Sequence, residues 1–153
     1  MFSFFQKKAV DFFSADEKAQ IVQAIQDAER RTSGEVRVYI ESRCAYVDPI
    51  RRARELFEQL NLHATDARNA VLVYMATKDR QLAIFGDQGI HDKVGNAFWN
   101  AEVAKMLQHF NKQDYGTGIS IVVKEIGEAL VEHFPYDAKG DKNELPDDIV
   151  FGK

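Results

Sequence analysis

The chain has 153 residues, of which 45% are hydrophobic and 29% are charged, and its formal net charge is −4. This balance is typical of an ordinary globular domain and not of a disordered chain. The negative charge disfavours nucleic acid as a partner, because phosphate binding needs a basic surface.

The sequence also predicts the compartment. No apolar run approaches the ~20 residues that span a bilayer, so no membrane span is expected. The aromatic N-terminus carries its lysines after its apolar stretch, which is the reverse of a secretory signal. The single cysteine, Cys44, cannot form an intramolecular disulfide. We therefore expect a cytoplasmic protein.

The first third of the chain predicts helix, strand and helix in that order. Ser14 and Glu17 have the spacing of a capping box, and the amphipathic helix behind them should end at Gly34. The β-branched residues of 35–41 predict a strand. Asp48, followed by proline, is typical of the start of a second helix.

Further along, residues 70–76 form a continuous apolar run, as expected of a strand that is covered on both faces. A turn follows, and 81–85 should return as the hairpin partner. Apolar periodicity then predicts helices over 97–107 and 119–134. These elements predict an α/β fold, in which one domain has a central mixed β-sheet sandwiched between α-helices.

We divide the chain into three parts. Residues 1–13 form an aromatic N-terminal helix or extension, 14–135 form the α/β domain, and 136–153 form an acidic C-terminal arm packed on it. The N-terminal aromatic residues should pack on the core, because exposed aromatic patches of that size are uncommon in monomers. We expect a monomer in preference to an oligomer.

The topology predicts one site at one end of the sheet. A right-handed crossover makes the first two strands parallel, and the hairpin reverses the third. The starts of strands 35–41 and 70–76 and the end of strand 81–85 should therefore lie together. The candidate metal ligands there are Glu35, Asp66 and Asp87, whose hard oxygens suit Ca²⁺ or Mg²⁺.

Four other polar residues should lie at the same end and bind a ligand or phosphate, namely Thr32, Ser33, Arg68 and Asn69, with His91 nearby. The alternative is that these side chains only cap the strands and build turns. No glycine-rich phosphate loop or dinucleotide fingerprint is present, which leaves no nucleotide or organic cofactor to expect.

Three blocks of sequence together resemble the TPM-domain family, whose name comes from thylakoid-lumen, photosystem-repair and receptor-modulating members. The blocks are Thr32–Val38, Arg68–Tyr74 and Ile84–His91. The resemblance extends over about 14–135, and the closing Asn143–Asp147 is similar to the tail of a compact soluble bacterial branch. It implies a mixed sheet between helices, an acid-phosphatase activity known mainly from plant lumenal members, and divalent metal binding in some relatives.

Two functions fit these observations. The first is a non-enzymatic module that binds a divalent ion or another ligand through the loops and presents a surface to a protein partner. The alternative is a metal-dependent acid phosphatase, in which Glu35, Asp66 and Asp87 hold the ion and Arg68 with Asn69 steadies the phosphate. We favour the first, because active sites normally concentrate phosphate-holding groups and this cluster has one arginine.

Overall fold

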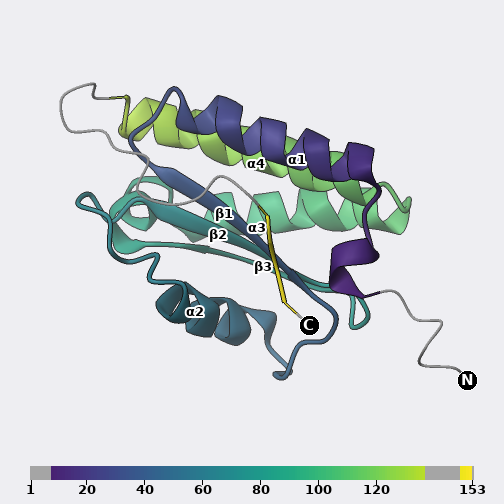
Figure 1. Ribbon diagram of the computed structural model, residues 1–153. Helices are drawn as coiled ribbons and strands as arrows, with labels where there is room; N and C mark the ends of the chain where they lie inside the picture. Colours follow the sequence, from purple (N-terminus) through teal and green to yellow (C-terminus); the bar gives the residue numbers. More distant parts are fainter. Residues whose placement is uncertain (1–7, 137–148, 153) are drawn as a thin grey trace, which may run out of the picture.

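The computed structural model describes residues 8–136 and 149–152, and the predictions for 1–7 and most of the acidic arm lie outside them. A four-stranded sheet in the order β3-β2-β1-β4 forms the middle layer (Figure 1). Helices α1, α3 and α4 cover one face of the sheet, and α2 covers the other (Figure 1). The predicted α/β fold, with a central mixed sheet between helices, is confirmed.

The strand directions follow the prediction. Strand β1 (Glu35–Glu41) pairs in parallel with β2 (Ala70–Ala76), and the hairpin strand β3 (Gln81–Gly86) runs antiparallel to β2. A short fourth strand, β4 (Val150–Phe151), pairs in parallel with the outer side of β1. The starts of β1 and β2 and the end of β3 therefore share one end of the sheet, at the left of Figure 1.

Helices α1 (Ala15–Glu29) and α4 (Tyr115–His133) lie side by side on the sheet (Figure 1). The predicted capping box starts α1: the Ser14 hydroxyl accepts from the Glu17 N–H, and the Glu17 carboxylate accepts from the Ser14 N–H. Ahead of it, the short 3₁₀ helix η2 (Ala9–Asp11) leads to Phe13, which is buried in the core.

Helix α3 (Gln88–Asn111) begins well before the predicted start at 97, and this is a correction to the sequence analysis. The carboxylate of Asp87 caps the helix by accepting from the Gln88 N–H. Gly95, with φ of 76°, then interrupts the helical backbone. The break resets the apolar periodicity, so the pattern revealed only the segment that follows it.

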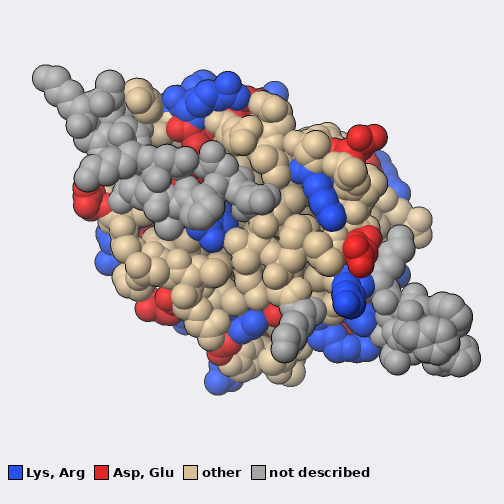
Figure 2. Space-filling view, in the orientation of Figure 1, with Lys and Arg blue, Asp and Glu red and all other residues tan. Residues whose placement is uncertain are grey.

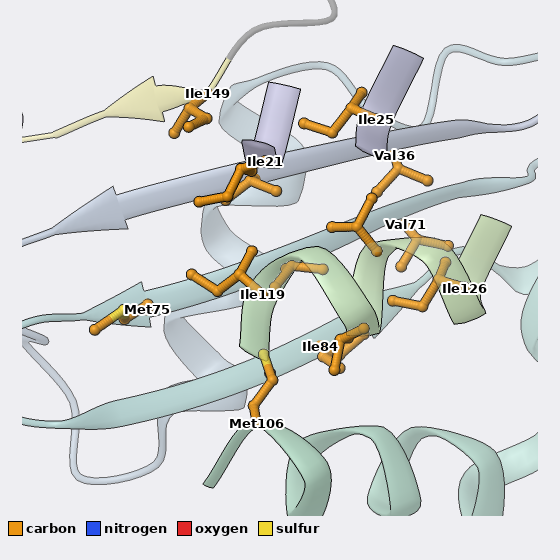
Figure 3. Close-up of a cluster of buried hydrophobic side chains, with 14 of the residues drawn as sticks. Ile21, Ile25, Val36, Val71, Met75, Ile84, Met106, Ile119, Ile126 and Ile149 are labelled. Atoms are coloured by element: carbon orange, nitrogen blue, oxygen red, sulfur yellow. The ribbon is translucent and has the colours of Figure 1, made fainter. Parts of the chain in front are cut away.

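Apolar side chains from both layers form the core. Figure 3 shows part of the larger cluster, in which aliphatic residues of β1, β2 and β3 meet those of α1, α3 and α4. A second cluster lies under α2 (Pro49–Gln59), where Phe57 and Leu56 pack against Leu72 and Tyr74. Among the described residues, no helix has the length and apolar character needed to cross a membrane.

A buried ion pair connects α2 to the far end of the sheet, where β1 and β2 end. The Arg52 guanidinium donates to both oxygens of Glu41, at 2.8 and 2.9 Å, and the hydroxyl of Tyr74 donates to the same carboxylate. The side chains of Arg52 and Glu41 are only 17% and 9% exposed. Burial and the hydrogen bond to Glu41 raise the pKa of Tyr74, which keeps the phenol protonated.

Glu102 on α3 is a second buried carboxyl group, 3% exposed, in the contact with α4. Lys105 bridges it to Glu125, with its ammonium 3.3 Å from Glu102 and 2.7 Å from Glu125. One oxygen of Glu102 is buried and accepts no hydrogen bond. Burial, reinforced by the neighbouring Glu125 carboxylate, raises the pKa of Glu102 to about 7.

The raised pKa of Glu102 should make the free energy of unfolding depend on pH. The ordinary pKa of glutamate is 4.5, so between pH 4.5 and about 7 the folded protein holds a proton that the unfolded chain has lost. Stability from Glu102 is therefore complete below 4.5 and falls as the pH rises to 7. We expect Glu102→Gln, measured by urea unfolding, to be more stable than the parent by about 1–2 kcal/mol at pH 8 and similar to it at pH 4.5. An equal effect at both values would contradict this assignment.

The surface is mixed in charge. Figure 2 shows basic and acidic side chains interspersed around uncharged surface, so neither sign dominates the described part of this face.

Candidate functional site

The three loops at the left end of the sheet in Figure 1 meet through backbone hydrogen bonds. The Glu35 N–H donates to the Asn69 carbonyl at 3.3 Å, and the Asp87 N–H donates to the Ala70 carbonyl at 2.9 Å. The Gly89 N–H donates to the Arg68 carbonyl at 2.8 Å. The start of β1, the start of β2 and the start of α3 are therefore fixed to one another.

Arg68 and Asp87 form the charged centre of these loops. The Arg68 Nε lies 2.6 Å from Asp87 Oδ2, and its Nη2 lies 2.8 Å from Oδ1. Asp87 is buried, whereas half of the Arg68 side chain is exposed. The hydrogen bond to Asp87 raises the pKa of Arg68. Arg68 also has a left-handed backbone, with φ of 52°, which is uncommon for this residue type and is found where surrounding contacts impose it.

The three carboxylates predicted as metal ligands do not gather. Glu35 is buried at the first position of β1, Asp66 is exposed in the loop before β2, and both oxygens of Asp87 accept from Arg68. In 8–136 and 149–152, no three His, Cys, Asp or Glu side chains are placed to hold a metal ion together. The arrangement therefore does not fit a Ca²⁺ or Mg²⁺ centre of these three residues, and metal binding stays a prediction from the sequence.

The predicted ligand-binding residues Thr32, Ser33 and Asn69 take part in local hydrogen bonds. Thr32 Oγ1 donates to the Phe134 carbonyl and accepts from the Gly34 N–H at 3.0 Å. The side-chain amide of Asn69 donates to Ser33 Oγ at 3.3 Å. Thr32 and Asn69 are almost fully buried. These contacts join the start of β1 to the end of α4 and to the loop before β2, as the turn-building alternative predicts.

Beside the Arg68–Asp87 pair lies a cavity of about 530 Å³. Residues of α2, of the end of the edge strand β3 and of α3 on both sides of Gly95 line it. Its lining residues are Ile50, Arg54, Arg68, Ile84, Phe85, Gly86, Asp87, Gln88, His91, Asn96, Trp99 and Asn100. The cavity extends the predicted site toward α2, a direction that strand order alone did not reveal.

Two contacts order the side chains around this cavity. The Trp99 indole N–H donates to Nδ1 of His91 at 3.0 Å, across the break at Gly95. The guanidinium of Arg54 lies 5.7 Å from the centre of the Phe85 ring, in a cation–π arrangement.

Sequence reasoning missed the cavity role of Arg54, Asn96, Trp99 and Asn100. Asp48, which caps α2 by accepting from the Ile50 N–H at 3.1 Å, begins the helix that carries Arg54 over the hairpin. No sequence pattern marks this contact, because Arg54 and Phe85 are remote in the sequence and come together only in the fold.

Known proteins match most of this chain in sequence and in fold. A family model described as the TPM domain matches residues 7–129. The BA42 protein of the psychrophilic bacterium Bizionia argentinensis is 35% identical, with a TM-score of 0.82, and the match covers 92% of this chain and 96% of that one.

Two more distant solved structures share the fold. The N-terminal domain of a protein from P. gingivalis is 16% identical with a TM-score of 0.65, and the match covers 82% of this chain and 83% of that one. The N-terminal domain of the cg2496 protein from Corynebacterium glutamicum is 18% identical with a TM-score of 0.61, covering 77% and 74%. A search of curated proteins finds no match. The family model and the BA42 protein show that the chain belongs to the TPM-domain family.

Proposed function

We propose that this TPM domain is a ligand-binding module that acts through the cavity beside Arg68 and Asp87. One observation carries the proposal: a cavity of about 530 Å³ opens at the end of the sheet where the three loops converge, and polar side chains of α2 and α3 line it together with aromatic ones. Small-molecule sites have this character, being concave, partly apolar and furnished with a few oriented polar groups.

The Arg68–Asp87 pair supports this function by holding one wall in place. Because the pair is bidentate and the Gly89 N–H donates to the Arg68 carbonyl, the loop before β2 and the first turn of α3 are joined at three hydrogen bonds. Preorganised walls lower the entropic cost of binding. Acid phosphatase activity stays a prediction from the family resemblance. The arrangement adds no support for it, because both Asp87 oxygens accept hydrogen bonds from Arg68 and Asp87 was one of the expected metal ligands.

The test uses three probes with the same ring and different charge: benzyl alcohol, benzoate and benzylamine. Each is titrated into the full chain while backbone amide shifts are recorded. We expect saturable shifts at Arg54, Gly86 and His91 with at least one probe. Asn100→Phe, which places a ring in the mouth of the cavity, should weaken this binding at least tenfold.

Lys93→Phe is the matched control, because Lys93 is exposed on the same helix and does not line the cavity. It should leave the titration unchanged. Absence of saturable shifts with all three probes would overturn the proposed function, as would equal binding by Asn100→Phe and the parent chain.

A further inference from the structure

The cavity has an uneven charge balance. Its lining includes two arginines and one carboxylate, and that carboxylate, Asp87, is fully engaged by Arg68. Arg54 is exposed, and its guanidinium lies over the Phe85 ring. Within the described part of the chain, no carboxylate forms an ion pair with Arg54. The cavity therefore holds one positive charge that a ligand can neutralise.

The neutral polar groups of the cavity include a fixed donor. Because Trp99 donates to Nδ1 of His91, a neutral His91 ring carries its proton on Nε2, where it can donate to a ligand. The amides of Asn96 and Asn100 are exposed at the mouth and can donate as well. A ligand oxygen that accepts hydrogen bonds matches this set.

The remaining wall is apolar. The cavity extends round the edge strand β3: Ile50 and Phe85, which are partly exposed, line its part on the α2 face of the sheet, and the more buried Ile84 and Trp99 line its part on the α3 face. The Arg54 guanidinium already lies near the Phe85 ring, so an apolar ligand body beside that ring would bring its charged group within reach of Arg54.

Resting on the proposed function, we infer that the ligand is a monoanion, a carboxylate carried on an apolar body, and that Arg54 is the residue that recognises it. A guanidinium fork matches the two oxygens of a carboxylate. One unpaired cation balances one negative charge, whereas a phosphate monoester with two charges would leave one uncompensated in this cavity. Arg54 selects the charge, and the wall of Ile50 and Phe85 accepts the apolar body.

The experiment compares benzoate with benzamide, its uncharged counterpart, and with phenyl phosphate. Binding is followed by amide shifts and by the fluorescence of Trp99, the only tryptophan in the chain. We expect benzoate to bind at least tenfold more tightly than benzamide or phenyl phosphate. Arg54→Gln should remove the advantage over benzamide and leave benzamide binding itself unchanged.

Arg51→Gln is the matched control. Arg51 is exposed on the same helix, lies over the Tyr46 ring at 4.5 Å and does not line the cavity. It removes the same charge from α2, so it should leave benzoate binding within twofold of the parent value. An equal loss in Arg51→Gln and Arg54→Gln would show long-range attraction and overturn recognition by Arg54.

Different results would overturn the monocarboxylate ligand and the ligand-binding function. Equal binding of benzoate and benzamide, or tighter binding of phenyl phosphate, would overturn the monocarboxylate and leave the ligand-binding module standing. Failure of benzoate, benzamide, benzyl alcohol and benzylamine alike to shift cavity residues would overturn both.

Discussion

Replacing Arg52 by methionine is expected to lower the free energy of unfolding by about 3–5 kcal/mol, because it removes one partner of a buried ion pair and leaves the other charge uncompensated. Glu41 would keep only the hydrogen bond from Tyr74 among the contacts described above, in a position where its side chain is 9% exposed. Urea unfolding at neutral pH measures the effect directly.

Arg51→Met is the control for that measurement. The two arginines are adjacent on α2, but Arg51 is exposed and its loss should change stability by no more than about 0.5 kcal/mol. Adding Glu41→Gln to Arg52→Met should restore part of the lost stability, because the stranded charge is then absent. A cost below about 1 kcal/mol for Arg52→Met would show that water reaches Glu41 and that the pair contributes little.

Gly89→Ala is expected to cost about 3 kcal/mol and to disturb the cavity. A Cβ at this position would lie 2.1 Å from the Ala67 carbonyl oxygen and 2.7 Å from that of Arg68. Both obstacles are backbone, so the first turn of α3 and the loop before β2 must separate, which strains the structure as overpacking does. That movement would weaken the hydrogen bond from the Gly89 N–H to the Arg68 carbonyl, and it would weaken the Arg68–Asp87 ion pair.

Urea unfolding gives the stability of this variant, and amide shifts of Arg68 and Asp87 report the local movement. Lys93→Ala, an exposed change on the same helix, should shift stability by no more than about 0.5 kcal/mol. Near-parental stability together with unchanged Arg68 and Asp87 shifts would refute the close approach of these two segments.

The sheet could be predicted because its strands carry strong and consistent signals. Residues 70–76 are buried at every position, and such a run has few alternatives to a central strand. Once the order of helix, strand and hairpin was known, handedness placed Arg68 and Asp87 at the same end. The prediction that these two residues lie at one end of the sheet therefore came from topology and not from their own sequence context, and the ion pair between them was not predicted.

The rest of the site could not be predicted, for two physical reasons. Polar residue types do not reveal whether their hydrogen-bonding groups face a ligand or other parts of the chain, and here Thr32 bonds to the backbone and Asn69 to the Ser33 hydroxyl. A cavity also depends on the distance between elements that are remote in sequence. Arg54 of α2 and Asn100 of α3 line the same cavity although they are far apart along the chain. The early start of α3 was hidden because Gly95 interrupts the periodicity on which helix prediction depends.

The interruption at Gly95 divides the cavity between two rigid pieces. Asp87 and His91 belong to the piece that is fastened to the end of the sheet, whereas Trp99 and Asn100 belong to the piece that runs on over α4. The Gly95 backbone sets how these two pieces of α3 lie relative to each other, and the His91–Trp99 hydrogen bond joins them. The width of the proposed ligand cavity therefore depends on a residue that does not line it.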